Sequence, residues 1–269
     1  MEFSVLMSVY IKEKPEYLRQ CLDSMLAQTV SPNQIVLVED GELTEELYKV
    51  IDEYKTDIFK IVKLKENIGL GNALKEGLDA CDYPLIARMD TDDIAFPQRF
   101  EKQLEEFKKD PELDICGSHA LEFDGEITNI TSKKNVPLTN EEIYNYAKKR
   151  NPFNHPTVMY KKKAVIDAGN YQDALSFEDY YLWARMLVNG AKGKNIDDYL
   201  LYFRTGGDMF KRRGGYEYLK NALAIKWKIH KLGLSSFLDC MISSAVHIAV
   251  SLMPNKLRGF VYRKFLRKN

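Results

Sequence analysis

Short apolar runs alternate with segments of helical spacing along the first 110 residues of the chain. The runs that we expect to be strands are 3–10, 34–40, 59–64 and 84–89. The segments that we expect to be helices are 15–26, 43–54, 71–81 and 97–109. Near-continuous apolar strands are typical of sheets buried on both faces, and strands that alternate with helices form βαβ units. This half of the chain therefore predicts an α/β fold with a parallel sheet flanked by helices.

The pattern is less regular after Asp110. Residues 115–123 look like a strand, and residues 125–137 look like a turn-rich excursion. The segment 139–149 opens with T-N-E-E, a sequence typical of a capped helix start. A further helix is expected where Glu178 and Asp179 precede the mostly apolar segment 181–187.

Three polar groups follow strands of the predicted sheet. They are Ser8-Val9-Tyr10, Glu39-Asp40-Gly41 and Asp90-Thr91-Asp92-Asp93. Ligands of parallel α/β sheets bind beyond the carboxyl ends of the strands, so these groups are expected at one edge. Asp-x-Asp at such an edge suits Mg²⁺ or Mn²⁺, which prefer oxygen ligands and leave coordination sites for phosphates. The alternative is structural, because Asp92 or Asp93 could cap the helix that opens near Pro97.

Composition and charge narrow the class of protein. The 269 residues are 45% hydrophobic and 12% aromatic, which fits a folded globule. Net charge is zero, but residues 226–269 hold nine Lys/Arg and one acid, a charge of +8. The four scattered cysteines indicate a reduced, cytoplasmic chain, and the N-terminus lacks the pattern of a signal peptide. The apolar stretch 237–253 is too short and polar for a membrane span.

Six ordered motifs in the first 205 residues resemble a known family. They are S-V-Y, V-L-V-E-D-G, E-N-I-G-L-G-N-A-L-K-E-G, R-M-D-T-D-D followed by P-Q-R-F, N-H-P-T-V-M, and F-E-D-Y-Y-L-W-A-R. Each is weak alone, but in this order they resemble family 2 glycosyltransferases with the GT-A fold, a mostly parallel, Rossmann-like sheet. Bacterial enzymes that build surface polysaccharides are the most similar members. Two departures are Ile11, where the family often has Asn, and E-D-G-E in place of D-D-G-S.

The resemblance implies a nucleotide-sugar site and a divalent metal, Mn²⁺ or Mg²⁺. Asp92 would ligate the metal that bridges the donor diphosphate, and Asp90 would contact the ribose or support the site. Asp40 would accept a hydrogen bond from a uracil N–H. The other residues implied in nucleotide binding are Ser8, Val9, Tyr10, Asn67, Gly69 and, less directly, Arg88.

The same resemblance implies Asp179 as general base, with Glu178 as its neighbour. Two acids at a helix start are also what the helix dipole favours without any catalysis. Arg185 is expected either to orient Asp179 or to form a structural ion pair. Further candidates for contact with the diphosphate or the acceptor are His155 and the glycine-flanked basic loop that holds Lys211, Arg212 and Arg213.

Three segments are expected within this architecture. Residues 1–110 form the nucleotide-sugar-binding half, residues 111–215 form the acceptor-binding and catalytic half, and residues 216–269 form a helical, basic C-terminal segment. A basic amphipathic segment is typical of proteins that bind anionic membrane surfaces. We therefore expect a cytoplasmic protein, peripheral to the inner face of the plasma membrane. The competing interpretation is that 243–253 packs on the catalytic domain.

The predicted function is an inverting transfer of a hexosyl or N-acetylhexosaminyl group from a UDP-sugar to a lipid-linked or free saccharide. One alternative is a catalytically inactive nucleotide-sugar-binding module. Another is a dinucleotide-dependent enzyme, because Gly69 and Gly71 follow a strand and Asp90 lies about twenty residues further on. Leu74 stands at the third glycine position of that motif, which weakens this alternative. Nucleic-acid binding is not expected, because the basic segment lacks interleaved aromatic residues on a basic face.

Overall fold

The computed structural model describes residues 1–174, 176–206, 215–251 and 253. Within these residues nine strands form one sheet in the order β3-β2-β1-β4-β8-β6-β9-β5, and β7 pairs with β6. The strands are β1 (Phe3–Val9), β2 (Gln34–Glu39), β3 (Phe59–Lys63), β4 (Leu85–Arg88), β5 (Ile94–Ala95), β6 (Leu113–Phe123), β7 (Ile130–Lys134), β8 (Met159–Lys161) and β9 (Lys192–Arg204). The helices are α1 (Pro15–Leu26), α2 (Glu45–Tyr54), α3 (Leu70–Ala80), α4 (Arg99–Lys109), α5 (Asn140–Ala147), α6 (Lys162–Asp167), α7 (Glu178–Val188), α9 (Tyr216–Lys231) and α10 (Phe237–Ser251), with a short 3₁₀ helix, η1 (His155–Thr157).

Strands β3, β2, β1 and β4 are parallel, as the alternation of strands and helices predicts. Alternate residues of β1 enter different cores. Val5 and Met7 pack with the apolar residues of α1, α2 and α4, whereas Leu6 packs with those of α3 and α7. Burial on both faces explains why these strands read as continuous apolar runs. The predicted α/β architecture is therefore confirmed.

Helix α3 lies unusually close to the sheet at Gly77. A Cβ at this position would come within 2.5 Å of side-chain atoms of both Leu6 and Val38. Only glycine therefore allows the helix to pack at this distance. The close contact holds the N-terminus of α3 near the carboxyl ends of the strands, where ligands bind in such sheets.

The second half of the sheet is mixed. Strand β8 is antiparallel to both β4 and β6, β6 is parallel to β9, and β5 is antiparallel to β9. The prediction of a turn-rich excursion over 125–137 is wrong in part, because this segment contains β7. Only Ser132 of β7 is buried, so its sequence lacks the apolar signal of a strand. The predicted helix start at Thr139 is confirmed, with a capping box between Thr139 and Glu142.

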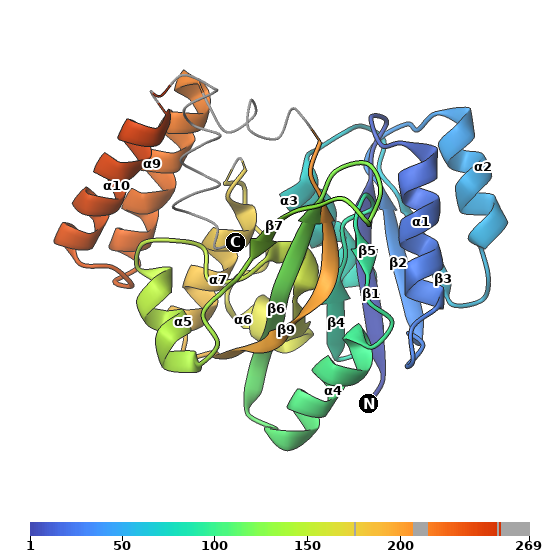
Figure 1. Cartoon of the computed structure of the whole chain (residues 1–269), viewed down its shortest axis with the longest axis horizontal. Helices are drawn as coiled ribbons and strands as arrows, with labels where there is room; N and C mark the ends of the chain where they lie inside the picture. Colours follow the sequence, from blue (N-terminus) through green and yellow to red (C-terminus); the bar gives the residue numbers. More distant parts are fainter. Residues whose placement is uncertain (175, 207–214, 252, 254–269) are drawn as a thin grey trace.

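Helices α9 and α10 form a hairpin at the end of the molecule opposite α2 (Figure 1). Only Cys240, Ser243 and Ser251 of α10 are fully buried, although most of its residues are apolar. No helix in the described part of the chain has the length and apolar character needed to cross a membrane. The basic residues after 253 and the loop residues Lys211, Arg212 and Arg213 lie outside the described residues.

Candidate active site

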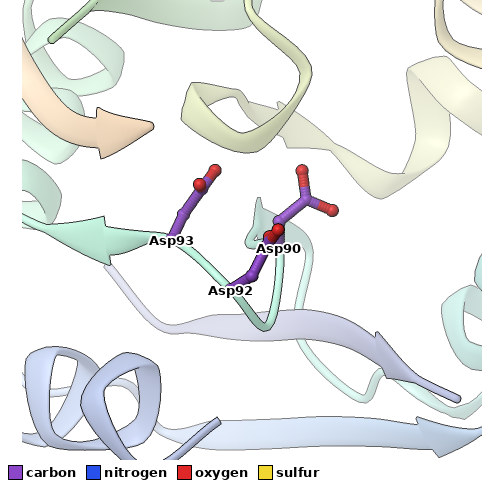
Figure 2. A group of neighbouring side chains, drawn as sticks. All are labelled: Asp90, Asp92 and Asp93. Atoms are coloured by element: carbon purple, nitrogen blue, oxygen red, sulfur yellow. The ribbon is translucent and has the colours of Figure 1, made fainter. Parts of the chain in front are cut away.

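The three aspartates occupy a tight turn directly after β4. The amide of Met89 still donates to the carbonyl of Leu6 on β1, at 3.1 Å, and the turn begins one residue later. One carboxylate oxygen from each of Asp90, Asp92 and Asp93 lies within 4.8 Å of the others. Figure 2 shows Asp90 and Asp93 directed to the same side of the loop. The strand end therefore concentrates three carboxylates at the edge of the sheet that the sequence predicts.

Strand β9 holds this turn in place through Arg204. The Arg204 amide donates to Asp93 Oδ1 at 2.8 Å, and Arg204 Nε donates to the carbonyl of Asp92 at 2.7 Å. The alternative role of Asp92 or Asp93 as a helix cap is wrong. Helix α4 begins at Arg99 after Gln98, and no side chain caps it.

Burial and mutual repulsion raise the pKa values of the clustered carboxyls. The pKa of Asp92 rises to about 7, first because it is buried and then because Asp90 and Glu13 are close. The pKa of Asp93 is raised well above its usual value, again mainly by burial and then by Asp92. Carboxylates that raise each other's pKa gain from a nearby cation. The oxygen-only donor set fits a hard divalent ion such as Mg²⁺ or Mn²⁺.

Arg88 lies behind the cluster as a buried cation. Its side chain is 1% exposed, and Nη2 forms an ion pair with Asp90 Oδ1. Atoms Nε and Nη1 are buried and have no hydrogen-bond partner among the described residues. Arg88 thus contacts Asp90 from the protein side, where it offsets part of the negative charge.

The end of β2 is joined to the segment before α3. Asp40 Oδ1 accepts a hydrogen bond from the amide of Ile68 at 2.8 Å, and Asn67 Nδ2 donates to the carbonyl of Asp40 at 3.3 Å. Gly41 has a φ of +87°, and a Cβ there would lie 2.7 Å from the Asn67 nitrogen. This glycine therefore allows the two motifs to meet. Gly69, at φ +84°, immediately precedes α3.

The end of β1 lies beside the aspartate turn. The hydroxyl of Thr91 contacts the carbonyl of Ser8 at 3.4 Å and donates to Glu13 at 2.7 Å. Val9 is buried and Tyr10 is exposed. The polar groups that follow β1 and β4 therefore meet, as their positions at strand ends predict.

Glu178 and Asp179 begin helix α7, as the sequence predicts. Asp179 accepts hydrogen bonds of 2.6 Å from the amide of Tyr180 and from Asn151 Nδ2. Burial raises the pKa of Asp179, and burial followed by the charge of Asp179 raises that of Glu178 to about 7. A Cβ on Gly71 would touch the Glu178 side chain at 3.0 Å, so α3 and α7 are in close contact here.

A single cavity of about 730 Å³ joins the two acidic groups. Asp90, Asp92, His155 and Asp179 all line it. His155 is buried, its Nε2 lies 3.2 Å from the Tyr171 hydroxyl, and burial lowers its pKa well below the usual value. The ring is therefore neutral at pH 7. The predicted nucleotide-binding residues Ser8, Val9, Tyr10, Asp40, Asn67 and Gly69 do not line this cavity.

Arg185 lies apart from the predicted base. Its guanidinium donates to the carbonyls of Ala168 and Asn170, the second at 2.7 Å, and the side chain does not line the cavity. Arg185 therefore joins α7 to the chain that follows α6.

The structure adds residues that sequence patterns alone do not single out. Glu13 and Arg204 hold the aspartate turn, and Asn151 donates to Asp179. Lys149, Arg150 and Lys226 line the same cavity as the carboxylates. In the sequence these residues are polar side chains without a motif of their own, and such side chains are too common for the sequence to mark them as functional.

Comparison with known proteins agrees with this geometry. The model of the family described as "Glycosyl transferase family 2" matches residues 4–171. The chain belongs to this family. The amylovoran biosynthesis glycosyltransferase AmsE of Erwinia amylovora is 40% identical, over 97% of this chain and 98% of its own.

A second relative has a named reaction. It is the UDP-Gal:alpha-D-GlcNAc-diphosphoundecaprenol beta-1,3-galactosyltransferase of Escherichia coli, 37% identical over 99% of this chain and 97% of its own. The crystal structure of S. aureus TarS residues 1–349 in complex with UDP-GlcNAc matches with a TM-score of 0.63. That match covers 99% of this chain and 72% of the TarS 1–349 chain, at 17% identity. The protein is therefore a family 2 glycosyltransferase, and the predicted GT-A fold is confirmed.

Proposed function

We propose that this glycosyltransferase moves a sugar from a UDP-sugar to a hydroxyl of a lipid-linked saccharide, with inversion, in cell-surface polysaccharide synthesis. The observation that carries the proposal is that Asp92 and Asp179 line one cavity. The donor and the acceptor are supported by relatives whose names specify amylovoran synthesis and a diphosphoundecaprenol-linked acceptor. The complex of TarS with UDP-GlcNAc supports a nucleotide-sugar donor for this fold.

In this proposal the two acidic groups have separate tasks. The acceptor oxygen attacks the anomeric carbon, the bond to the diphosphate breaks, and Asp179 takes the acceptor proton. Glu178, His155 and Arg185 were all candidates near this step, but only His155 lines the cavity with Asp179. Because the His155 ring is neutral, we assign it a hydrogen-bonding task towards the substrates.

The residues proposed to bind the nucleotide-sugar are those that the resemblance of the motifs implies. A divalent cation held by Asp92, with Asp90 beside it, would stabilise the charge that develops on the leaving diphosphate. Arg88 would act on the nucleotide site only through Asp90, because it is buried. The residues proposed to bind the nucleoside are Ser8, Val9, Tyr10, Asp40, Asn67 and Gly69. The division of the chain into segments at residues 110 and 215 stays a prediction.

Peripheral attachment to an anionic membrane surface is also proposed. Six apolar side chains of α10 are between 38% and 66% exposed, which supports contact with lipid. They are Phe237, Leu238, Met241, Ile242, Val246 and Ile248.

The test is turnover of a panel of UDP-sugars, with and without a lipid-linked saccharide acceptor, in Mn²⁺, Mg²⁺ or EDTA. Asp92→Asn should abolish metal-dependent turnover, and Asp179→Asn should lower transfer by about 10² to 10⁴-fold while UDP still binds. Asp167→Asn, on exposed α6, is the matched control. Turnover that survives both EDTA and Asp92→Asn would contradict the metal assignment. Donor binding without turnover in the wild type would favour the inactive binding module.

A further inference from the structure

The cavity that holds the acidic groups has a second, basic end. Lys149 and Arg150 follow α5, and Lys226 comes from α9. Among the described residues, the acids that line the cavity are Asp90, Asp92 and Asp179, and we call the part of the cavity that they line the acidic end. Asn151, which donates to Asp179, directly follows Arg150 in the chain. The cations therefore begin next to the proposed base.

Contacts among their side chains and backbone place these cations together. Lys226 is 6% exposed, and its Nζ donates to the carbonyl of Lys149 at 3.1 Å. Burial, followed by the charges of Lys226 and Arg150, lowers the pKa of His247 to about 4. The three positive charges and the His247 ring therefore share one small region.

Within the described segments, little negative charge compensates this cluster. Lys149 pairs with Asp239 of α10 at 3.1 Å. Arg150 stacks on the ring of Tyr146, and its centre lies 5.4 Å from the ring centroid. Lys226 is bonded to a carbonyl rather than to a carboxylate. Lys226 is therefore a buried cation for which the described residues provide no carboxylate, a costly arrangement that an anionic ligand would relieve, and the exposed Lys149 and Arg150 add positive charge beside it.

The wall beside the cations is apolar and leads out of the cavity. Ile242, Val246 and Val250 of α10 line it, and Ile242 and Val246 are 45% and 54% exposed. Other exposed apolar residues of α10 lie next to them along the helix. A ligand bound here can therefore place an anion against Arg150 and Lys226 and a hydrocarbon chain along α10.

We propose that Lys149, Arg150 and Lys226 bind the diphosphate of the lipid-linked acceptor, and that Ile242 and Val246 contact the first part of its lipid. The sugar of the acceptor then lies between the diphosphate and Asp179. This inference rests on the proposed function, since it assigns a subsite to that acceptor. The donor diphosphate is placed at the opposite, acidic end by the same proposal.

Binding of farnesyl diphosphate tests the subsite without turnover. Calorimetry on the full chain should show that Lys149→Ala/Arg150→Ala weakens binding by about tenfold or more, because charge-assisted hydrogen bonds to phosphate are lost. The matched control is Lys148→Ala, whose side chain contacts Asn145 and Tyr144 outside the cavity lining. Val246→Asn, which makes this position polar without adding charge beside the cations, should weaken binding of farnesyl diphosphate but not of inorganic diphosphate, because only the former has a hydrocarbon chain.

Equal affinity of the wild type and the double variant for farnesyl diphosphate would overturn the inference. Displacement of the probe by UDP would also overturn it, because the probe would then occupy the donor site. Failure of the proposed function gives a different result, in which no UDP-sugar is turned over although the probe binds. The two proposals can therefore fail independently.

Discussion

Replacing Asn151 with alanine should move the acidic limb of sugar transfer to higher pH. A general base works only when it is deprotonated, so activity falls as the pH drops through its pKa. Asn151 donates a 2.6 Å hydrogen bond to Asp179 and thereby lowers the pKa of a carboxyl that burial raises. Without this donor, the pKa of Asp179 rises further.

The size of the shift follows from the bond that is lost. A hydrogen bond to a charged group contributes about 1.5–3 kcal/mol. Asp179 is half-buried, so water replaces part of that energy and about 1 kcal/mol is lost. Since one pKa unit corresponds to about 1.4 kcal/mol, the acidic limb should shift upward by about 0.5–1 unit.

A second variant should shift the same limb in the opposite direction. The charge of Asp179 raises the pKa of Glu178, and this interaction is mutual. Glu178→Gln removes one of the two like charges, so the remaining carboxyl should ionise at lower pH.

The assay is kcat/KM for transfer to a lipid-linked saccharide acceptor, measured from pH 5 to 8. Asn145→Ala, on the exposed face of α5, serves as the control and should leave the profile unchanged. A uniform loss of rate in Asn151→Ala, with the acidic limb unmoved, would refute the reasoning. In that case Asn151 would only position Asp179.

Three further perturbations test the fold around the site. Gly41→Ala should lower the free energy of unfolding by about 1–3 kcal/mol, because φ is +87° and the new Cβ meets the Asn67 backbone; unchanged urea denaturation would contradict this. Arg204→Ala should lower the free energy of unfolding by about 3 kcal/mol, because the hydrogen bond to the Asp92 carbonyl is lost. The variant should also need more Mn²⁺ for half-maximal activation, as measured by Mn²⁺ titration of turnover. Burial lowers the pKa of Lys226 to about 8 in the folded state, against about 10.4 for an unperturbed lysine. Between these two pH values the unfolded state binds more protons than the folded state, so the free energy of unfolding of the wild type should rise with pH. Lys226→Met should lose that rise and should be more stable than the wild type at pH 7 by up to about 3 kcal/mol. The measurement is urea denaturation at several pH values, and a variant whose unfolding free energy still rises with pH as in the wild type would contradict the role of Lys226.

Local patterns determine the first half of the fold. In β1 and β2 every residue except Ser8 is buried on one face or the other, so both strands appear in the sequence as apolar runs. The carboxyl ends of parallel strands meet at one edge of the sheet, so the turn that holds Asp90 and Asp92 could be predicted to lie beside Ser8, and Thr91 of this turn does contact the Ser8 carbonyl. The position of Asp179 at the start of a helix could also be predicted from the sequence, but its distance from Asp90 and Asp92 could not.

The second half depends on contacts between distant segments. Strand β9 carries charged residues at its start and forms a strand by pairing with β6 and β5. That pairing brings Arg204 to Asp92, across more than a hundred residues of sequence. No periodicity in the chain contains this information, because the partner strand supplies the hydrogen bonds.

The cavity is the clearest case of a feature that only the tertiary structure decides. Asp92 lies in the turn after β4, Asp179 in α7 and Lys226 in α9, and no sequence spacing relates them. The chain by itself determined which chemical groups stand at strand ends and helix starts. Packing of the α9–α10 hairpin against α7 decided that an acidic end and a basic end share one cavity, because side chains far apart in sequence become neighbours only when their elements pack together.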